Sequence, residues 1–497
     1  VGVADPSVST MATSNEKTPL TGTINDDGNG AVLSMKASFR ESVRALSVSV
    51  SHHVGKIGFL GSMSIAVNSL TGPAMLNLPD TYQRAGLIPT TMTVIFVCIL
   101  SALCCLHMAN TISKVPGNSN YKKEIEYSET FEKFWGHRSF VYTQILFFCC
   151  VSCLNVSSIV DTAQVVDTVV GHWIPGGTGA LQFLRLGEGT PQIHWLRWDY
   201  NVCSPEMLVD GDCVPFGAED GIIFSAGYVV VLFIFVPMAL MDLKENAAWQ
   251  VAGFLVLIVT SLQFVYLFAR EGVHTENLSL WGESWDTLFG VVLFNFALVI
   301  AVPAWLYEKE PHVDVPTVIK CSSMMAAVLY ISIGILGAMT MPNVSQNMLE
   351  SMLSGAFGVS MEICASVFAF FIIGIGCPLF SVLTRMNLTG SGLVSHEVGN
   401  LLAVYLPFSV SWLFYQGDAV TELLSWGGII FTSLVAFILP LLIALHSIDT
   451  SDNEGAVAVY GQRYSHLSKK RHKIVLKILL VGAGISISAA IVGNVFQ

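Results

Sequence analysis

Apolar segments long enough to cross a membrane follow one another along most of this chain, separated by short polar stretches. From residue 57 onward, runs of about 18 or more mostly apolar residues, the length that a membrane-spanning helix needs, recur eleven times. They lie at about 57–85, 87–112, 139–169, 219–241, 247–269, 286–307, 317–341, 357–384, 397–415, 420–446 and 473–495. The pattern predicts an all-α polytopic membrane protein with 11 transmembrane helices.

Two of these runs carry polar or helix-breaking residues at mid-depth. The first reads NSLTGP at 68–73, and the sixth contains Asn295 and Pro303. Proline removes a backbone donor and clashes with the preceding turn, so we expect both helices to be interrupted. Interrupted helices at corresponding positions of two halves are typical of transporters built as inverted repeats. A packing kink, common in membrane helices, stays open as the alternative, above all for Pro303.

The spacing of the runs divides the chain into five parts. The first fifty residues are rich in Ser, Thr, Asn and Asp and contain no apolar core of a signal peptide, so we expect a disordered cytoplasmic tail. The predicted parts are the tail 1–54, repeat 1 at 55–269 with helices 1–5 and the outer loop 170–218, repeat 2 at 286–446 with helices 6–10, a cytoplasmic loop at 447–472, and helix 11 at 473–497.

Composition and charge agree with a membrane protein and indicate its orientation. The chain has 53% hydrophobic and 12% charged residues, whereas soluble proteins carry about 25% charged residues. With the N-terminus in the cytoplasm, all Lys and Arg residues lie inside except Arg84, Arg185, Arg197 and Arg270. This bias follows the positive-inside rule and predicts an extracellular or lumenal C-terminus. Plasma membrane and endolysosomal or vacuolar membrane both stay open, and the net charge of −12 argues against a nucleic-acid partner.

Two chemical features fall in the predicted outer loops. Asn277 and Asn343 each begin an Asn-x-Ser sequon, so we expect glycosylation there. Cys203 and Cys213 share the loop 170–218, where an oxidising compartment favours a disulfide worth about 2–3 kcal/mol. A zinc site is the weaker alternative, because no His or further Cys flanks the pair at ligand spacing.

Four segments together carry a resemblance to a known family. They are Asn68 with GPAMLNLP (72–79) and Gly86 in the first span, IVDTAQ (159–164), PMALMDLKENAAW (237–249), and CPLFSVLTRMN (377–387). In this order, over about residues 55–495, the chain resembles the amino acid/auxin permease family of the amino acid–polyamine–organocation transporters. The resemblance implies a 5+5 inverted-repeat fold with broken helices 1 and 6, and amino acid transport by alternating access.

The breaks suggest where a substrate would bind. A half-helix beginning at Pro73 would point free amides and partial positive charge into the membrane centre, which favours a carboxylate. The α-amino group would meet carbonyls near 68–71 and at the second break. The apolar run at 296–300 favours a neutral amino acid, with an apolar side chain as one case, and no cofactor is expected. The predicted substrate-binding residues are Ser69, Thr71, Gly72, Ala74, Met75, Phe296, Ala297, Leu298 and Val299.

The eighth span indicates which ion drives transport. Sodium-using members of the family place a hydroxyl shortly before the proline that Pro378 matches, whereas here Gly374 and Gly376 stand there. We therefore favour H⁺ over Na⁺, with uncoupled exchange left open. Asn68 is predicted either to help bind the ion or to hold the broken helix by a hydrogen bond. Asp161, and less so Asp167, are the proton-carrying candidates; the alternative places both in an outer aqueous vestibule.

A sensor and an enzyme are the alternatives to a transporter. A non-transporting amino-acid sensor would use the same pocket. An enzyme is not expected, because the chain contains no His-Glu-x-x-His pair, no Walker loop and no Ser/His arrangement at plausible spacing. The predicted partners are an amino acid, a coupling ion and the membrane lipid.

Overall fold

The computed structural model describes most of the chain after residue 55. The described residues are 56–183, 193–200, 215–216, 222–285, 288–342, 344, 348–353, 357–390, 392, 394–415, 426–450, 459 and 468–495. The chain separates into the units Val1–Val54 and Gly55–Gln497, and only the second is described below. The predicted tail, Cys203, Cys213 and Asn343 lie outside the described residues.

The polytopic α-helical class is confirmed. Within the described residues, nine helices are long and apolar enough to cross a membrane, and two further apolar helices are shorter. The nine are α4 (Leu87–Ser113), α6 (His137–Trp173), α9 (Leu243–Glu271), α10–η4–α11 (Leu288–Glu308), α12 (Val315–Thr340), α14–η5–α15 (Val359–Thr389), α16 to η7 (His396–Phe414), η8–α19 (Ile429–Ile448) and α21 (Lys469–Gly493). The shorter two, α2 (Phe59–Leu70) and α8 (Ala226–Ala239), fall in the predicted first and fourth spans.

The fourth span and the preceding loop differ from the prediction. Helix α8 begins at Ala226, not near 219, because Ile222–Ser225 forms a strand, β3. It joins β1 (Thr178–Phe183) and β2 (Ile193–Trp198) in an antiparallel sheet of order β2-β1-β3. Ser225 ends the strand and caps the helix, since its hydroxyl accepts a hydrogen bond from the Tyr228 amide. Part of the predicted loop 170–218 therefore forms two strands of this sheet, with β1 at its centre.

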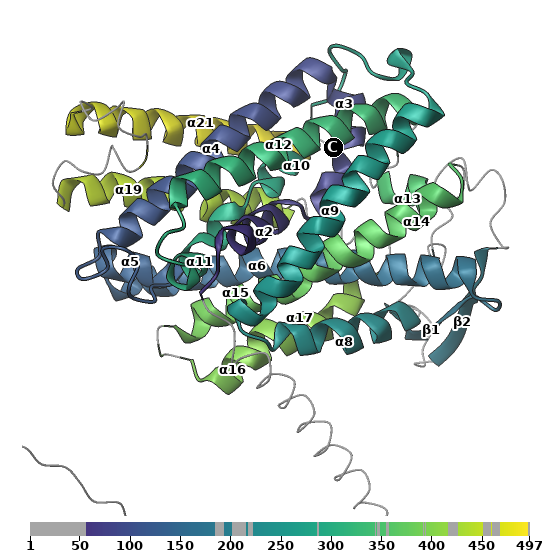
Figure 1. The fold of residues 1–497 in the computed structure, drawn as a ribbon, viewed down its shortest axis with the longest axis horizontal. Helices are drawn as coiled ribbons and strands as arrows, with labels where there is room; N and C mark the ends of the chain where they lie inside the picture. Colours follow the sequence, from purple (N-terminus) through teal and green to yellow (C-terminus); the bar gives the residue numbers. More distant parts are fainter. Residues whose placement is uncertain are drawn as a thin grey trace, which may run out of the picture. The chain divides into compact units, whose positions relative to one another are not determined.

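Helix contacts in the first five spans have counterparts in the second five, and Figure 1 shows one of them, α2 beside α9. Helix α2 packs against α9 as α10 packs against η8, and α3 (Leu78–Ala85) packs against α12 as α11 packs against α4. The corresponding helices α4 and α12 contact each other, and so do α6 and α15 (Gly374–Thr389). These contacts of the first five spans thus have counterparts in the second five, as is expected of an inverted repeat.

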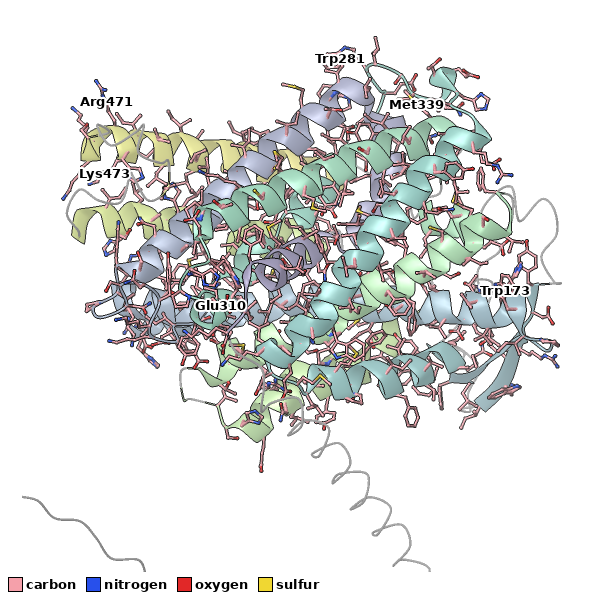
Figure 2. All side chains as sticks on the ribbon, viewed as in Figure 1. Trp173, Trp281, Glu310, Met339, Arg471 and Lys473 are labelled. Carbon is pink, nitrogen blue, oxygen red and sulfur yellow. The ribbon has the colours of Figure 1, made fainter. Side chains whose placement is uncertain are left out.

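Backbone hydrogen bonds join segments of the two broken helices at both ends of the bundle, and an ion pair lies beside them at one end. At one end the Ile57 amide donates to the Glu308 carbonyl over 2.8 Å, and Lys244 and Glu308 pair at 2.9 Å. At the other end the Gly282 amide donates to the Ala85 carbonyl over 2.9 Å. Figure 2 shows the basic residues Arg471 and Lys473 at the opposite end of the helices from Trp173. In this conformation both ends of the central helices are closed by protein contacts.

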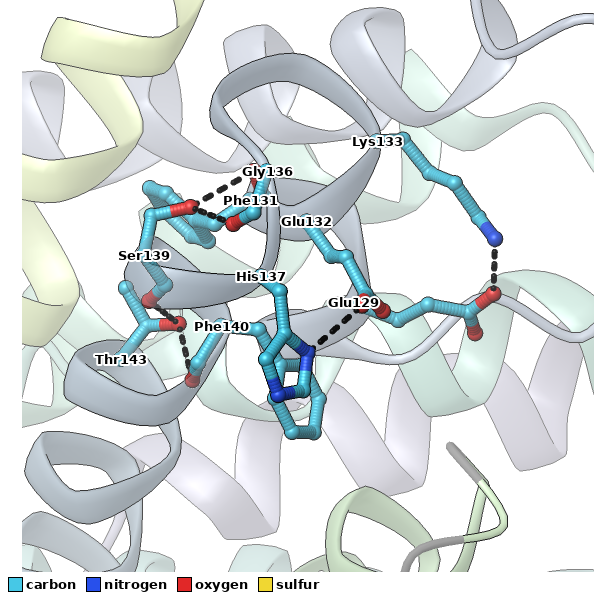
Figure 3. A network of polar contacts seen from close by, with 9 residues as sticks. All are labelled: Glu129, Phe131, Glu132, Lys133, Gly136, His137, Ser139, Phe140 and Thr143. Atoms are coloured by element: carbon cyan, nitrogen blue, oxygen red, sulfur yellow. Dashed lines mark hydrogen bonds and ion pairs between the residues drawn. The ribbon is translucent and has the colours of Figure 1, made fainter.

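A short helix that the sequence analysis missed, α5 (Tyr127–Trp135), packs against the start of α6. Figure 3 shows the turn between them, where Gly136 adopts a φ of 86° and the Ser139 hydroxyl donates to the Gly136 and Phe131 carbonyls. The amide of Ser128 donates to Asn387 Oδ1 over 3.0 Å. This contact fastens α5 to the end of α15, where Asn387 is buried.

Just before α5, Glu126 places a carboxyl group in a buried and acidic environment. Its side chain is 3% exposed, and its Oε1 atom has no hydrogen-bond partner in the described structure. Burial, and then the charges of Glu124, Glu129 and Glu308, raise the pKa of Glu126 to about 8. The carboxyl group is therefore protonated at neutral pH in the folded protein.

This raised pKa predicts that the protein becomes less stable as pH rises. Between pH 4.5 and about 8, the folded state holds a proton on Glu126 that the unfolded state releases. The contribution of Glu126 to the free energy of unfolding is therefore complete below pH 4.5. It declines as the pH rises toward 8, by at most about 1.4 kcal/mol per pH unit. The variant Glu126→Gln is expected to flatten the melting temperature over this range. Glu397→Gln, an exposed change on α16 (His396–Asn400), is the control. An unchanged slope in Glu126→Gln contradicts the prediction.

Candidate functional site

The predicted break in the first span is present. Helix α2 ends at Leu70, and the Gly72 amide turns back to donate to the Leu70 carbonyl over 3.0 Å. A 3₁₀ segment, η1 (Pro73–Asn77), then leads into α3. Proline suits the first position of this segment because its missing N–H would have no intrahelical partner there. Two half-helices therefore replace one continuous span.

The sixth span is interrupted in the same way. Helix α10 (Leu288–Asn295) ends at Asn295, the 3₁₀ segment η4 covers Leu298–Ile300, and α11 (Val302–Glu308) begins with Pro303 in its first turn. The break lies directly before Pro303, as predicted. Segment η1 contacts α10, and α2 contacts η4, so the two breaks meet inside the bundle.

A tyrosine hydroxyl from a third helix joins the two breaks. Tyr330, on α12, is fully buried, and its hydroxyl lies within hydrogen-bond distance of the Leu70 carbonyl and 3.2 Å from the Asn295 carbonyl. Its ring packs edge-on against Phe296 at 5.3 Å between centroids. Ser101, on α4, donates to the Phe296 carbonyl over 2.7 Å. Carbonyls at both breaks are thus held by hydroxyl donors.

Sequence reasoning missed Tyr330 and Ser101. The available signal was a hydroxyl group at mid-depth in each of two apolar spans. A hydroxyl in such a position needs an acceptor, because an unpaired polar group costs several kcal/mol in an apolar environment. Which acceptor it meets depends on which spans are neighbours, and the sequence does not state this.

The predicted substrate-binding residues lie at these two breaks. Ser69 and Thr71 are buried, and their hydroxyls bond back to carbonyls of α2, at 2.9 Å and 3.0 Å. The Met75 amide donates to the Gly72 carbonyl over 3.1 Å. Gly72 is partly exposed, and a Cβ added there would have no atom within 4 Å. The other members with described side chains, Phe296, Ala297, Leu298 and Val299, are all buried. This conformation is closed around the breaks, with open space beside Gly72.

Asn68 contacts the fifth span. Its Nδ2 atom donates to the backbone carbonyl and to Oε1 of Gln250, over 2.8 Å and 2.9 Å. The Gln250 side chain in turn donates to Asn246 Oδ1 and to the Ile375 carbonyl of α15. The amides thus link α2, α9 and α15, which is the geometry expected of the helix-holding role.

The two glycines of the eighth span have different surroundings. A Cβ at Gly374 would lie 2.5 Å from the Phe235 ring of α8, a distance that real Cβ atoms do not tolerate. At Gly376 the nearest atoms would be Phe380 at 3.5 Å and Ser158 Oγ at 3.9 Å. The close approach of α8 therefore explains why position 374 carries no hydroxyl side chain.

Asp161 and Asp167 both lie on α6 and are 6% and 0% exposed. Asp161 accepts a hydrogen bond from Ser157 over 3.2 Å. Asp167 accepts bonds from the Thr178 hydroxyl at 2.6 Å, the Gly227 amide at 2.8 Å and the Tyr415 hydroxyl at 2.7 Å. In this conformation the two carboxyl groups are enclosed rather than placed in an open vestibule, and Asp167 joins three separate elements.

Two of the segments that carried the family resemblance meet in space. Arg385, from CPLFSVLTRMN, is 3% exposed. Its guanidinium donates to the Ala239 and Met241 carbonyls, which follow the proline of PMALMDLK, and to Asn400 Oδ1 at 3.2 Å. A cation at a helix C-terminus satisfies orphan carbonyls and complements the helix dipole. The arginine therefore closes the end of α8.

One apolar groove of about 520 Å³ lies away from the breaks, between α4 and α12. Its walls include Ile99, Met324 and Val328, which are more than half exposed. A surface of this kind on membrane-spanning helices faces the lipid, so the groove is not part of the candidate site.

The predicted glycosylation residue Asn277 is partly buried, and its amide donates to the Met339 carbonyl over 3.1 Å.

No protein-family model matches the chain, and no curated protein matches it in sequence. A solved structure that it resembles is Mhp1, a nucleobase-cation-symport-1 family transporter, in a closed conformation with bromovinylhydantoin bound. The two share 13% identity over 89% of this chain and 92% of that one, with a TM-score of 0.49. A likeness this weak carries no conclusion about function.

Proposed function

We propose that this chain is a secondary active transporter of neutral amino acids that works by alternating access with proton coupling. The observation that carries the proposal is the meeting of two broken helices inside a bundle with twofold contacts. Broken helices at the repeat interface are the usual substrate site of secondary transporters, because their free backbone groups can bind charged substrate groups inside the membrane.

The two breaks offer opposite charges to a zwitterion. The amides of Gly72, Ala74 and Met75 at the start of η1 would bind the carboxylate. The carbonyls of Leu70 and Asn295, each at the last residue of a helix, would bind the ammonium group. Because the Gly72 and Met75 amides bond within the break in this closed conformation, substrate binding would exchange those bonds for bonds to the carboxylate.

The proposal of H⁺ rests on α6 and α15. Gly374 cannot be replaced by a hydroxyl residue without moving Phe235, and the Asn68 amide is engaged with Gln250. Asp161 is buried on α6 and accepts a hydrogen bond from Ser157, and α6 packs against α8 of the first repeat and α15 of the second. A buried carboxyl group close to both repeats can couple protonation to their relative movement.

Uptake into proteoliposomes tests the function. Purified full-length protein would be given a panel of amino acids under an imposed pH gradient or an imposed Na⁺ gradient. We expect saturable accumulation of neutral amino acids driven by the pH gradient. Saturable binding without flux would favour the sensor, and accumulation driven by Na⁺ alone would overturn proton coupling.

We predict that Asp161→Asn abolishes proton-driven accumulation and retains exchange. The amide keeps the shape and the Ser157 contact but cannot carry a proton, so the driving force is lost while alternating access continues. Accumulation under a pH gradient and counterflow under no gradient measure the two processes separately. Accumulation that keeps the wild-type pH dependence would contradict the prediction. Glu132→Gln, at the cytoplasmic helix α5, is the control.

A further inference from the structure

The Tyr330 hydroxyl occupies the point at which two helix C-termini converge. Leu70 ends α2 and Asn295 ends α10, so each carbonyl carries the partial negative charge of its helix end. Both lie within hydrogen-bond distance of the one hydroxyl. The negative ends of two helices thus share one hydroxyl donor that has only a partial positive charge, and the Leu70 carbonyl also accepts from the Gly72 amide.

A tyrosine hydroxyl satisfies this arrangement incompletely. It has one hydrogen, so it donates fully to only one of the two carbonyls at a time. A primary ammonium has three N–H donors and a full positive charge, and charge-assisted hydrogen bonds are roughly twice as strong as neutral ones. An ammonium group would therefore replace the hydroxyl with a gain in binding energy, provided the tyrosine moves aside.

We infer that Tyr330 is an internal substitute for the substrate ammonium, holding the two breaks together in the closed empty state and giving way when an amine binds. The inference rests on the proposed transport function and deepens it, because it makes a primary ammonium the group that the site selects. Tyr330 is thereby a specificity-determining residue: a ligand without a cationic donor has no means of displacing it.

The test is the variant Tyr330→Phe, which keeps the ring that packs against Phe296 and removes only the hydroxyl. Three probes separate the ligand's parts: leucine, isopentylamine, which lacks the carboxylate, and 4-methylpentanoate, which lacks the amino group. The affinities of the full-length protein in detergent for the three probes would be measured by isothermal titration calorimetry. The matched control is Tyr82→Phe, which removes another fully buried tyrosine hydroxyl, bonded to Thr91 at 3.1 Å.

We expect Tyr330→Phe to bind leucine and isopentylamine about tenfold more tightly than wild type, the equivalent of one lost competing hydrogen bond. The affinity for 4-methylpentanoate should not change, and Tyr82→Phe should leave all three affinities unchanged. Without ligand, Tyr330→Phe should melt at a lower temperature than wild type, and saturating isopentylamine should remove the difference.

Three results would overturn the inference. An equal gain for 4-methylpentanoate would mean that the variant only makes space. Weaker binding of both amines would mean that the hydroxyl is a direct ligand of the substrate. No binding of any probe to either protein would exclude an ammonium site altogether. If isopentylamine binds and tightens while leucine is neither bound nor transported, the inference stands and the proposed function fails.

Discussion

Replacing Arg385 by glutamine is expected to destabilise the protein by about 3 kcal/mol or more, among the largest effects of any single substitution in this chain. The guanidinium is buried, and it supplies donors to the Ala239 and Met241 carbonyls and to Asn400. Glutamine is shorter and neutral, so it leaves these acceptors in a dry environment without their charged donor, which is the costly way to break a buried charged network. The melting temperature of purified protein measures the loss.

Two companion variants identify the cause. Arg385→Lys should recover little stability, because an ammonium cannot fork between acceptors on two segments. Asp242→Asn should be close to neutral, because Asp242 is 81% exposed and lies 3.7 Å from the guanidinium, and exposed ion pairs contribute little. Asparagine also keeps the helix-capping role of Asp242 at α9. If Asp242→Asn were as harmful as Arg385→Gln, the important contact would be the ion pair between Arg385 and Asp242, and not the hydrogen bonds from Arg385 to the carbonyls at the end of α8.

The second large effect is expected for Asp167→Ala. This change removes the only group that the Thr178 hydroxyl, the Gly227 amide and the Tyr415 hydroxyl are seen to share in the described structure. Three buried donors would lose their acceptor, at about 1–3 kcal/mol each before any relaxation. We expect a melting temperature lower by several degrees and loss of monodisperse protein on size-exclusion chromatography.

Asp167→Asn and Thr178→Val grade this effect. Asparagine keeps one acceptor oxygen for Thr178 and Gly227, so it should cost less than alanine. Thr178→Val removes one donor and leaves the carboxylate the other two, so about 1 kcal/mol is expected. The order alanine, asparagine, valine at 178, from most to least harmful, follows from the geometry. Equal effects of Asp167→Ala and Thr178→Val would contradict a shared role for the carboxylate.

Several features could be predicted from the sequence because their causes are local. A long apolar run must be a helix in lipid, since only internal hydrogen bonds satisfy its backbone. Gly72-Pro73 and Pro303 interrupt such a helix wherever it packs, because proline removes a donor and blocks the preceding turn. The helical class and the positions of both breaks therefore follow from residue order.

The sheet and helix α5 were not predicted from the sequence. For the sheet, the reason is that the pairing of its strands is not local. The strands β1 and β2 lie 10 to 20 residues apart in a segment of mixed polarity, and β3 is the start of what reads as an apolar span. A short segment such as Ile222–Ser225, with three apolar residues and a serine, does not distinguish a strand from a helix start. Pairing with β1 decides it, through the register Ala180 to Ser225.

The roles of individual polar residues were decided only in three dimensions. Asn68 could bind an ion or hold a helix, and its observed partner, Gln250, lies 182 positions away in sequence. Tyr330 lies 260 positions from the Leu70 carbonyl. No local rule relates such pairs, because their contact depends on which spans pack together.

The sequence by itself determined that this protein lies in the membrane, that it is helical, and that two of its spans break at mid-depth, because solvation and backbone sterics act on each segment separately. The tertiary structure alone decided that both breaks face one tyrosine, that Arg385 closes α8 and that Asp167 joins three elements. The physical reason is that a hydrogen bond in a dry interior is made with whichever partner the packing of distant helices brings within reach.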